Sequence, residues 1–140
     1  MAEDREQKAL IKWSQQPEIR GKFPCLQFLY HIPNGGKRDP IEGKHLKQMG
    51  VKSGVPDLHF PVPNVKYHGF YIEMKYGKNK PSENQKWWIR HLRKLGHRVE
   101  VCYTWQEAAA ALVEYISEGI ILEDFEDDGH EINRKSRYER

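Results

Sequence analysis

The sequence predicts an α/β domain in three layers, with helices covering both faces of a central mixed β-sheet. Helix-like and strand-like segments follow the order helix, strand, helix, strand, strand, helix, strand, helix, which is typical of a sheet flanked by helices. A turn-rich break from Pro61 to Asn64 separates the two middle strands, so we expect them to form an antiparallel hairpin. The last strand follows a helix and therefore joins the sheet through a crossover connection.

Hydrophobic periodicity and turn residues place the individual elements. The expected helices are 3–15, 40–49, 81–95 and 105–117, and the expected strands are 24–32, 98–103 and two short apolar runs around Leu58 and Ile72. Gly50 and Gly96 should end the second and third helices. In the third helix, Trp88, Leu92 and Leu95 have the spacing of a buried side.

The chain length favours one domain that buries a modest core without disulfides. We expect this domain to span residues 1–118 and residues 119–140 to form a charged C-terminal tail that is partly disordered. An apolar patch at Ile120, Ile121 and Leu122 precedes the most acidic part of the tail. It could serve as a docking segment for a second copy of the chain.

Composition also bounds the setting in which the protein works. Cys25 and Cys102 each lie among apolar residues, so we expect buried, reduced thiols and an intracellular, cytoplasmic location. The polar, acidic first residues do not resemble a signal peptide. Apolar runs in the sequence are all far shorter than the ~20 residues that cross a bilayer, so no membrane partner is expected.

Positive charge is concentrated in the middle of the chain. Between Lys75 and Arg98 there are eight lysines or arginines and one acid, Glu83. Such a block suggests a polyanionic partner, although a solvated helix face is the alternative reading.

The hairpin carries the residues with the clearest chemistry. Folding residues 57 to 73 about Val65 places Asp57 opposite Glu73, with the two carboxylates about 5 Å apart. Glu73 and Lys75 are two residues apart, so their side chains share one face of the strand. A salt bridge on a solvated face is one explanation for these charges, and a site for a divalent cation is the other.

A cation site of this kind would suit phosphodiester hydrolysis. Two carboxylates, the backbone carbonyl of Met74 and water form an all-oxygen site for Mg²⁺ or Mn²⁺. Such a metal lowers the pKa of bound water, and Lys75 could orient that water or accept its proton. With Lys78, Lys80, Lys86 and Arg90 nearby to contact phosphates, a nucleic acid is the expected substrate.

With these residues established, the sequence resembles the PD-(D/E)xK nuclease superfamily. Pro56-Asp57 followed by Glu73-x-Lys75 matches the superfamily motif. The wider pattern is similar to the VRR-NUC, or virus-type replication-repair nuclease, branch, and extends from about residue 3 to residue 116. The further matching elements are an early acid followed by Gln7, the run His31 to Gly36, the run Gly50 to Leu58, and Gln85.

The resemblance implies a restriction-endonuclease-like three-layer core and a role for each matching residue. Asp57 and Glu73 would be metal ligands, Lys75 the catalytic lysine, and Gln85 a glutamine that supports the site from the following helix. Gln85 also has capping-box spacing from Ser82. The acid of the first helix maps onto Glu3, which could alternatively just offset the helix dipole, and Glu6 competes for that place. Asn34 would contact DNA unless it only forms a turn.

The resemblance also implies a metal-dependent DNA endonuclease of the stand-alone phage or bacterial kind. Such proteins resemble Holliday-junction-resolving enzymes that act as homodimers on branched or flapped DNA, without an organic cofactor. A non-catalytic DNA-binding module with a nuclease-like fold is the main alternative. A sequence-specific enzyme of the restriction type is less favoured, because the chain contains nothing similar to a recognition insert.

Overall fold

The computed structural model describes residues 2–33, 40–122, 128–130 and 132. Its elements in chain order are α1 (Ala2–Gln15), α2 (Pro17–Lys22), the 3₁₀-helix η1 (Pro24–Phe28), β1 (Tyr30–His31), α3 (Pro40–Gln48), β2 (Leu58–Phe60), β3 (Phe70–Met74), α4 (Glu83–Lys94), β4 (Arg98–Cys102) and α5 (Trp105–Ser117). The order of the expected elements is confirmed, and α2 and η1 are additional to them.

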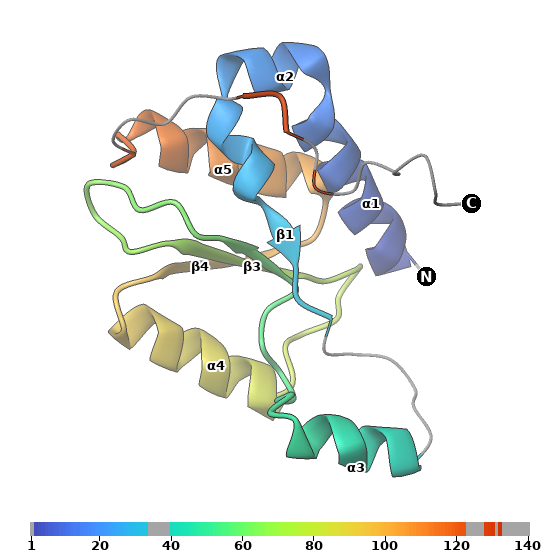
Figure 1. The fold of residues 1–140 in the computed structure, drawn as a ribbon. Coiled ribbons are helices and arrows are strands. Elements are labelled where there is room, and N and C mark those ends of the chain that lie inside the picture. Colours follow the sequence, from blue (N-terminus) through green and yellow to red (C-terminus); the bar gives the residue numbers. More distant parts are fainter. Residues whose placement is uncertain (1, 34–39, 123–127, 131, 133–140) are drawn as a thin grey trace.

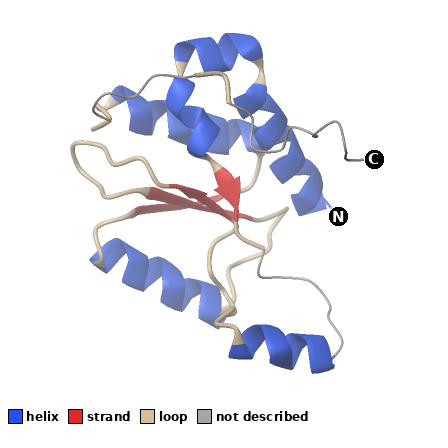
Figure 2. Cartoon of the chain, in the orientation of Figure 1, coloured by secondary structure: helices blue, strands red, loops and turns tan. Residues whose placement is uncertain are grey.

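The four strands form one mixed sheet in the order β1-β2-β3-β4. β1 and β2 pair antiparallel, β2 and β3 form the expected antiparallel hairpin, and β3 pairs with β4 in parallel. α4 provides the crossover between β3 and β4. In Figure 1, α1, α2 and α5 lie on one side of the sheet, and α3 and α4 lie on the other. Figure 2 shows the same three layers by secondary structure, which confirms the expected architecture.

Two clusters of buried side chains join the layers. The larger one lies between the sheet and the α1–α5 layer, and includes Leu10, Phe60, Ile72 and Tyr115. The smaller one, Ile89, Leu92 and Val99, joins α4 to the sheet. The sheet is therefore covered on both faces, and a charged side chain on either face close to its centre loses its contact with water.

The segment 24–32, expected as one strand, folds mostly as a 3₁₀-helix. Only Tyr30–His31 pair as a strand, and Pro24–Phe28 form the 3₁₀-helix η1. Pro24 occupies the start of this turn, where its fixed φ and missing N–H are tolerated. The turn buries the neighbouring residues Cys25 and Leu26 together, which an alternating strand would place on opposite faces.

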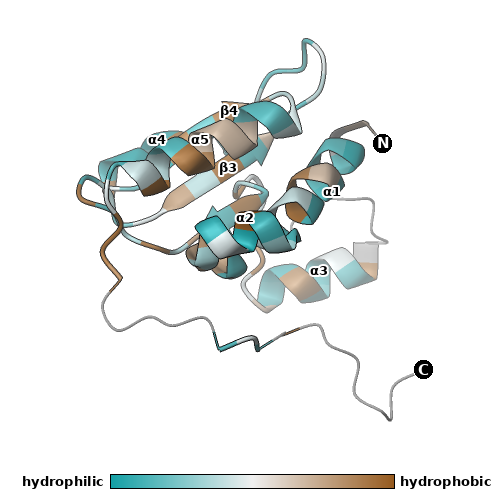
Figure 3. Ribbon diagram, turned by 90° about the horizontal axis from the view of Figure 1, so that it is seen from above, coloured by the Kyte–Doolittle hydropathy of each residue, from teal (hydrophilic) through white to brown (hydrophobic). Residues whose placement is uncertain are grey.

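Pro17–Lys22 form a further helix, α2, which is not among the helices expected from the sequence. None of its six residues is buried, so its sequence carries little of the apolar periodicity that reveals a helix, and Figure 3 shows α2 as largely hydrophilic. In α4 the buried residues are Ile89 and Leu92, and the prediction for Leu95 was wrong because Leu95 is exposed beyond the last turn.

The segment after α5 returns to the body of the domain. Ile120 forms a β-bridge with Asn64, and the Ile121 N–H donates to the Pro63 carbonyl at 2.8 Å. Ile120 and Leu122 pack against the larger core. The apolar patch therefore contacts its own chain, and two of its three side chains are used there rather than being left for a second copy.

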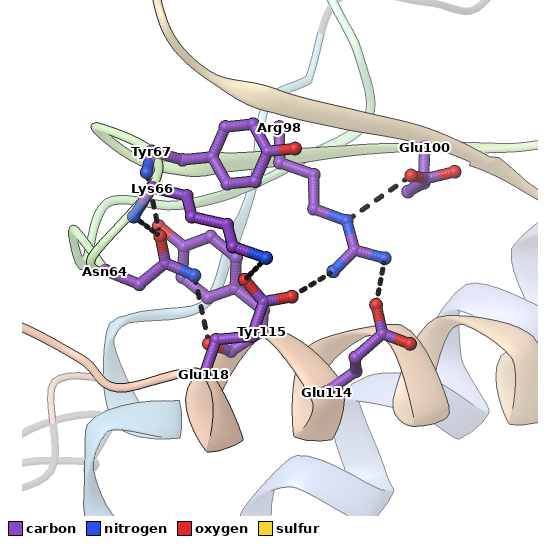
Figure 4. A network of polar contacts seen from close by, with 8 residues as sticks. All are labelled: Asn64, Lys66, Tyr67, Arg98, Glu100, Glu114, Tyr115 and Glu118. Carbon is purple, nitrogen blue, oxygen red and sulfur yellow. Dashed lines mark hydrogen bonds and ion pairs between the residues drawn. The ribbon is translucent and has the colours of Figure 1, made fainter.

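A polar network holds the tip of the hairpin against α5, as Figure 4 shows. The buried Asn64 side chain accepts from the backbone N–H groups of Lys66 and Tyr67, both at 2.8 Å, and donates to the Tyr115 carbonyl at 3.1 Å. The Tyr115 hydroxyl donates to the Val62 carbonyl at 2.6 Å. Because Asn64 closes the turn and bonds to α5 at once, it fixes both the hairpin and its docking.

Arg98 forms the charged part of the same network. Its guanidinium lies 3.1 Å from Glu114 and 3.3 Å from Glu100, and Glu118 is in turn 3.4 Å from Lys66. Figure 4 shows these ion pairs beside the hydrogen bonds of Asn64. They therefore add to the tether between the hairpin, β4 and α5.

Both cysteines are free and buried, as expected. Burial raises the pKa of Cys25 to about 11 and that of Cys102 to about 12, so neither thiol ionises near neutral pH. Within the described residues, no helix combines the length and apolar character needed to span a membrane.

Candidate active site

The hairpin register brings Asp57 and Glu73 together. Leu58 pairs with Ile72 and His59 with Tyr71, so the residues one step beyond the pairing, Asp57 and Glu73, lie across from each other. This is the alignment about Val65 that the sequence predicted. β3 leaves Glu73 on the face covered by α4, while Ile72 and Met74 enter the larger core.

Asp57 is anchored to the end of β3. Its Oδ2 accepts a hydrogen bond from the Met74 N–H at 2.8 Å. Burial nevertheless raises the pKa of Asp57, and the hydrogen bonds from Met74 and Glu73, with the charges of His31 and Lys75, only partly oppose that rise. A positive charge beside Asp57 would therefore favour its ionised form.

Glu73 is almost completely buried, with 2% of its surface exposed. Its Oε2 accepts from the Gln85 side-chain amide at 3.1 Å and lies 3.8 Å from the Lys75 ammonium. Lys75 is itself largely covered, with 14% of its side chain exposed. A buried carboxylate is costly without such partners, and here the amide and the ammonium supply them.

Gln85 performs both functions that the sequence left open. Its backbone N–H donates to the Ser82 hydroxyl at 3.2 Å, and its side-chain oxygen accepts from the Ser82 N–H at 2.8 Å, which completes a capping box at the start of α4. With the amide oxygen so occupied, the amide nitrogen points to Glu73. The helix cap therefore sets the orientation of the group that contacts the buried carboxylate.

A glycine allows the loop leading to Asp57 to lie against α4. Gly54 has a φ of +91°, and a Cβ at this position would lie 2.7 Å from the Asn84 backbone. Ser53 adds two contacts with the same helix: its hydroxyl accepts from the Asn84 amide at 3.2 Å, and its carbonyl accepts from the Trp88 indole N–H at 3.0 Å. The glycine-rich lead-in thus brings Asp57 and Gln85 to the same place.

Ser53, Asn84 and Trp88 are positioning residues that the sequence analysis did not assign to the site. The signal that could have found them is the tight glycine in the run Gly50 to Leu58, because such a residue marks a close approach to another backbone. The Nδ1 of His31 lies 2.7 Å from the Asp57 carbonyl oxygen, so His31 holds the segment that carries Asp57.

The donor set fits a hard divalent cation. Two carboxylates face each other, and Met74 points its N–H toward Asp57. The N–H and carbonyl of one strand residue point to the same edge, so the Met74 carbonyl faces that edge as well. Mg²⁺ commonly uses one or two carboxylates and completes its shell with water and substrate phosphate. No cluster of three acidic, histidine or cysteine side chains suitable for a metal occurs among the described residues.

Of the two first-helix acids considered for the site, Glu6 is bound elsewhere in the domain. The Glu6 carboxylate accepts from the Trp105 N–H at 3.0 Å, so it is used at the first turn of α5, where an acid is favoured by the helix dipole. Glu3 lies in α1, but its side chain is outside the described residues. Of the two acids weighed for this role, Glu6 already has a structural task.

The basic residues expected to contact DNA are exposed to solvent. Lys78, Lys80, Lys86 and Arg90 are all exposed. Lys86 lies 3.4 Å from Glu83 on the same helix, an exposed pair of little energetic weight. Asn34 is outside the described residues. The described cations thus leave a positive surface along the loop after β3 and the outer face of α4.

These features define a mixed α/β domain with a buried acid, Glu73, facing a half-buried acid, Asp57, at the end of its central hairpin. A solved structure described as a "VRR_NUC domain protein" is similar to this chain, with 30% sequence identity, a TM-score of 0.72, and coverage of 91% of this chain and 94% of the other. Comparison with curated proteins gave no significant match.

The model of the VRR-NUC domain family matches residues 1–105. The chain therefore belongs to the VRR-NUC domain family. Membership implies a nuclease-like function in DNA processing, in a family that generally uses divalent metals.

Proposed function

We propose that this protein is a Mg²⁺- or Mn²⁺-dependent endodeoxyribonuclease that hydrolyses phosphodiester bonds in branched or flapped DNA. The observation that carries the proposal is the contact set of Glu73. This buried carboxylate lies 3.1 Å from the Gln85 side-chain amide and 3.8 Å from the Lys75 ammonium. The N–H of Met74, the next residue on the same strand, donates to Asp57.

The proposed roles follow from the contacts of each side chain. Asp57, Glu73 and the Met74 carbonyl would hold the cation, which when bound would lower the pKa of a water and stabilise charge on the phosphoryl oxygen. Gln85 keeps Glu73 oriented from the side. Lys75 lies close enough to Glu73 to donate a hydrogen bond to the attacking water or to the phosphate as negative charge develops on it. Glu3 is the remaining candidate for a further acid.

The substrate contacts are proposed from charge. Lys78, Lys80, Lys86 and Arg90 are exposed around the site and would contact backbone phosphates, and Asn34 would join them. Such contacts bind DNA without reading sequence. A homodimer would place two sites on two strands of a branched substrate, with residues 1–118 forming the nuclease domain.

The test uses labelled four-way junctions, flaps and plain duplex, each with Mg²⁺, with Mn²⁺ and with a chelator. Cleavage should require metal and should be lost in Asp57→Asn, which still offers an acceptor to the Met74 N–H, and in Lys75→Met. Lys66→Met is the matched control, because Lys66 is an exposed lysine at the far end of the hairpin.

Failure to cut any of the three substrates with either metal would refute the proposal. DNA binding that persists in Asp57→Asn with no scission in the wild type would identify a binding module instead. Equal cleavage of junction, flap and duplex would refute the structure selectivity alone.

A further inference from the structure

An apolar groove lies beside the acid pair and has no role in the proposed metal chemistry. It encloses about 280 Å³ and is lined by Ile32, Pro33, Val51, Lys52, Val55 and Trp88. The volume lies just under the range of about 300–1,000 Å³ for small-molecule sites. It suits one flat ring system and is too small for a folded segment.

The groove is connected to the site by one hydrogen bond and by two short separations in sequence. The Ile32 N–H donates to the Asp57 carbonyl at 2.7 Å, and Val55 precedes Asp57 by two residues. Trp88 follows Gln85 by three residues on α4, so the two side chains point to the same side of the helix. A group seated in the groove would therefore be adjacent to the phosphate at Asp57 and Glu73.

The Trp88 ring is held in place before any ligand binds. Its indole N–H donates to the Ser53 carbonyl at 3.0 Å, and its ring meets Trp87 edge-on at a centroid distance of 5.2 Å. A ring fixed in this way offers a stacking surface without a further loss of side-chain entropy. The exposed Lys52 supplies a positive charge at the edge of the groove.

We propose that this groove accepts one unpaired nucleobase next to the scissile phosphate, with Trp88 stacking on the base and Lys52 contacting its phosphate. Stacking on aromatic side chains is the usual way in which proteins hold unpaired bases, and it tolerates any sequence. The combination of an apolar ring-sized groove, a preset indole and a lysine matches a nucleotide better than an apolar peptide side chain. The inference rests on the proposed function and specifies its substrate as DNA with an unpaired nucleotide at the cut site.

The experiment measures binding separately from cleavage. Flap DNA carries either 2-aminopurine or an abasic residue at the first unpaired position, and its affinity is measured with Ca²⁺ in place of Mg²⁺. The wild type should bind the base-containing flap about tenfold more tightly than the abasic flap, which corresponds to about 1.4 kcal/mol, and should quench the 2-aminopurine fluorescence.

Two variants and one control locate the effect. Trp88→Ala and Val51→Glu should reduce the affinity ratio to about one, and Trp88→Phe should keep part of it. Val51 is on the surface, with 37% exposed, so Val51→Glu tests the groove without disturbing the core. Leu95→Ala is the control, because Leu95 is an exposed apolar residue just after α4, with 65% of its surface exposed, and does not line the groove.

The outcomes separate this inference from the proposed function. A wild-type ratio near one, in a protein that cleaves flaps, overturns the groove assignment and leaves the nuclease intact. A ratio that is kept in both Trp88→Ala and Val51→Glu also overturns it. Base-dependent binding and quenching without cleavage of any substrate would instead support the groove and refute the enzyme.

Discussion

Replacing Gln85 separates helix capping from support of the active site. Its side chain accepts from Ser82 and donates to Glu73, so Gln85→Ala removes both contacts. Ser82→Ala is the matched variant. It removes the hydroxyl that accepts from the Gln85 N–H but leaves the backbone N–H that orients the amide.

The contacts removed by each substitution set the size of the expected effect. A hydrogen bond to a charged group contributes about 1.5–3 kcal/mol, and loss of a residue that orients a metal ligand typically costs about 10- to 100-fold in activity or metal affinity. Gln85→Ala should therefore lower kcat/KM for metal-dependent cleavage by about 10- to 100-fold. Ser82→Ala should lower the free energy of unfolding by about 1 kcal/mol and change kcat/KM less than twofold.

Two measurements on each variant are sufficient. Urea unfolding gives the stability, and initial rates of flap cleavage against metal concentration give both kcat/KM and the apparent metal affinity. The reasoning is refuted if Gln85→Ala cleaves like the wild type, or if Ser82→Ala loses as much activity as Gln85→Ala. The second result would mean that only the integrity of α4 matters.

Three further predictions concern the rest of the domain. Gly54→Ala should lower the free energy of unfolding by about 2 kcal/mol or more, because its φ is +91° and the Asn84 backbone occupies the Cβ position; unchanged urea stability would contradict this. Asn64→Ala should lower the free energy of unfolding by about 2–3 kcal/mol through loss of one buried and two partly buried hydrogen bonds, with thermal unfolding of Lys66→Ala as the control. Burial, with the charge of His97, lowers the pKa of His59 to about 4 from 6.5. Between pH 6.5 and 4 the unfolded chain therefore binds a proton at His59 that the folded chain does not bind. The free energy of unfolding should fall by about 1–2 kcal/mol as the pH is lowered from 6.5 to 4, after allowance for the half-exposed ring. His59→Gln should flatten that slope, and an unchanged slope would exclude His59 as its source.

The central hairpin could be predicted from the sequence because its determinants are local. The turn from Pro61 to Asn64 and the two flanking apolar runs fix a register in which Asp57 faces Glu73, since a shift by one residue would expose the buried side chains. The capping box of α4 was also predictable, because it depends on residues only three positions apart. What spacing did not show is that Gln85 serves the cap and Glu73 at once.

The elements that were missed depend on contacts between distant residues. η1 replaces most of an expected strand because Cys25 and Leu26 are buried together by the surrounding layers, and the composition of the segment is strand-like. The use of Glu6 at the start of α5 joins residues 99 positions apart. The contact of Ser53 with Trp88 likewise depends on how a loop packs against a helix, which no local pattern encodes.

The position of α5 has a consequence for where the folding unit ends. The family match stops at residue 105, yet α5 begins there and contributes Ala108, Leu112 and Tyr115 to the core with none of their surface exposed. Truncating one such buried leucine or aromatic residue typically costs about 2–5 kcal/mol, and a whole domain is stable by only about 5–15 kcal/mol. A fragment that ends at residue 105 would therefore not fold. The independently stable unit extends at least through Tyr115, which lies beyond the matched residues and whose hydroxyl donates to the Val62 carbonyl in the hairpin.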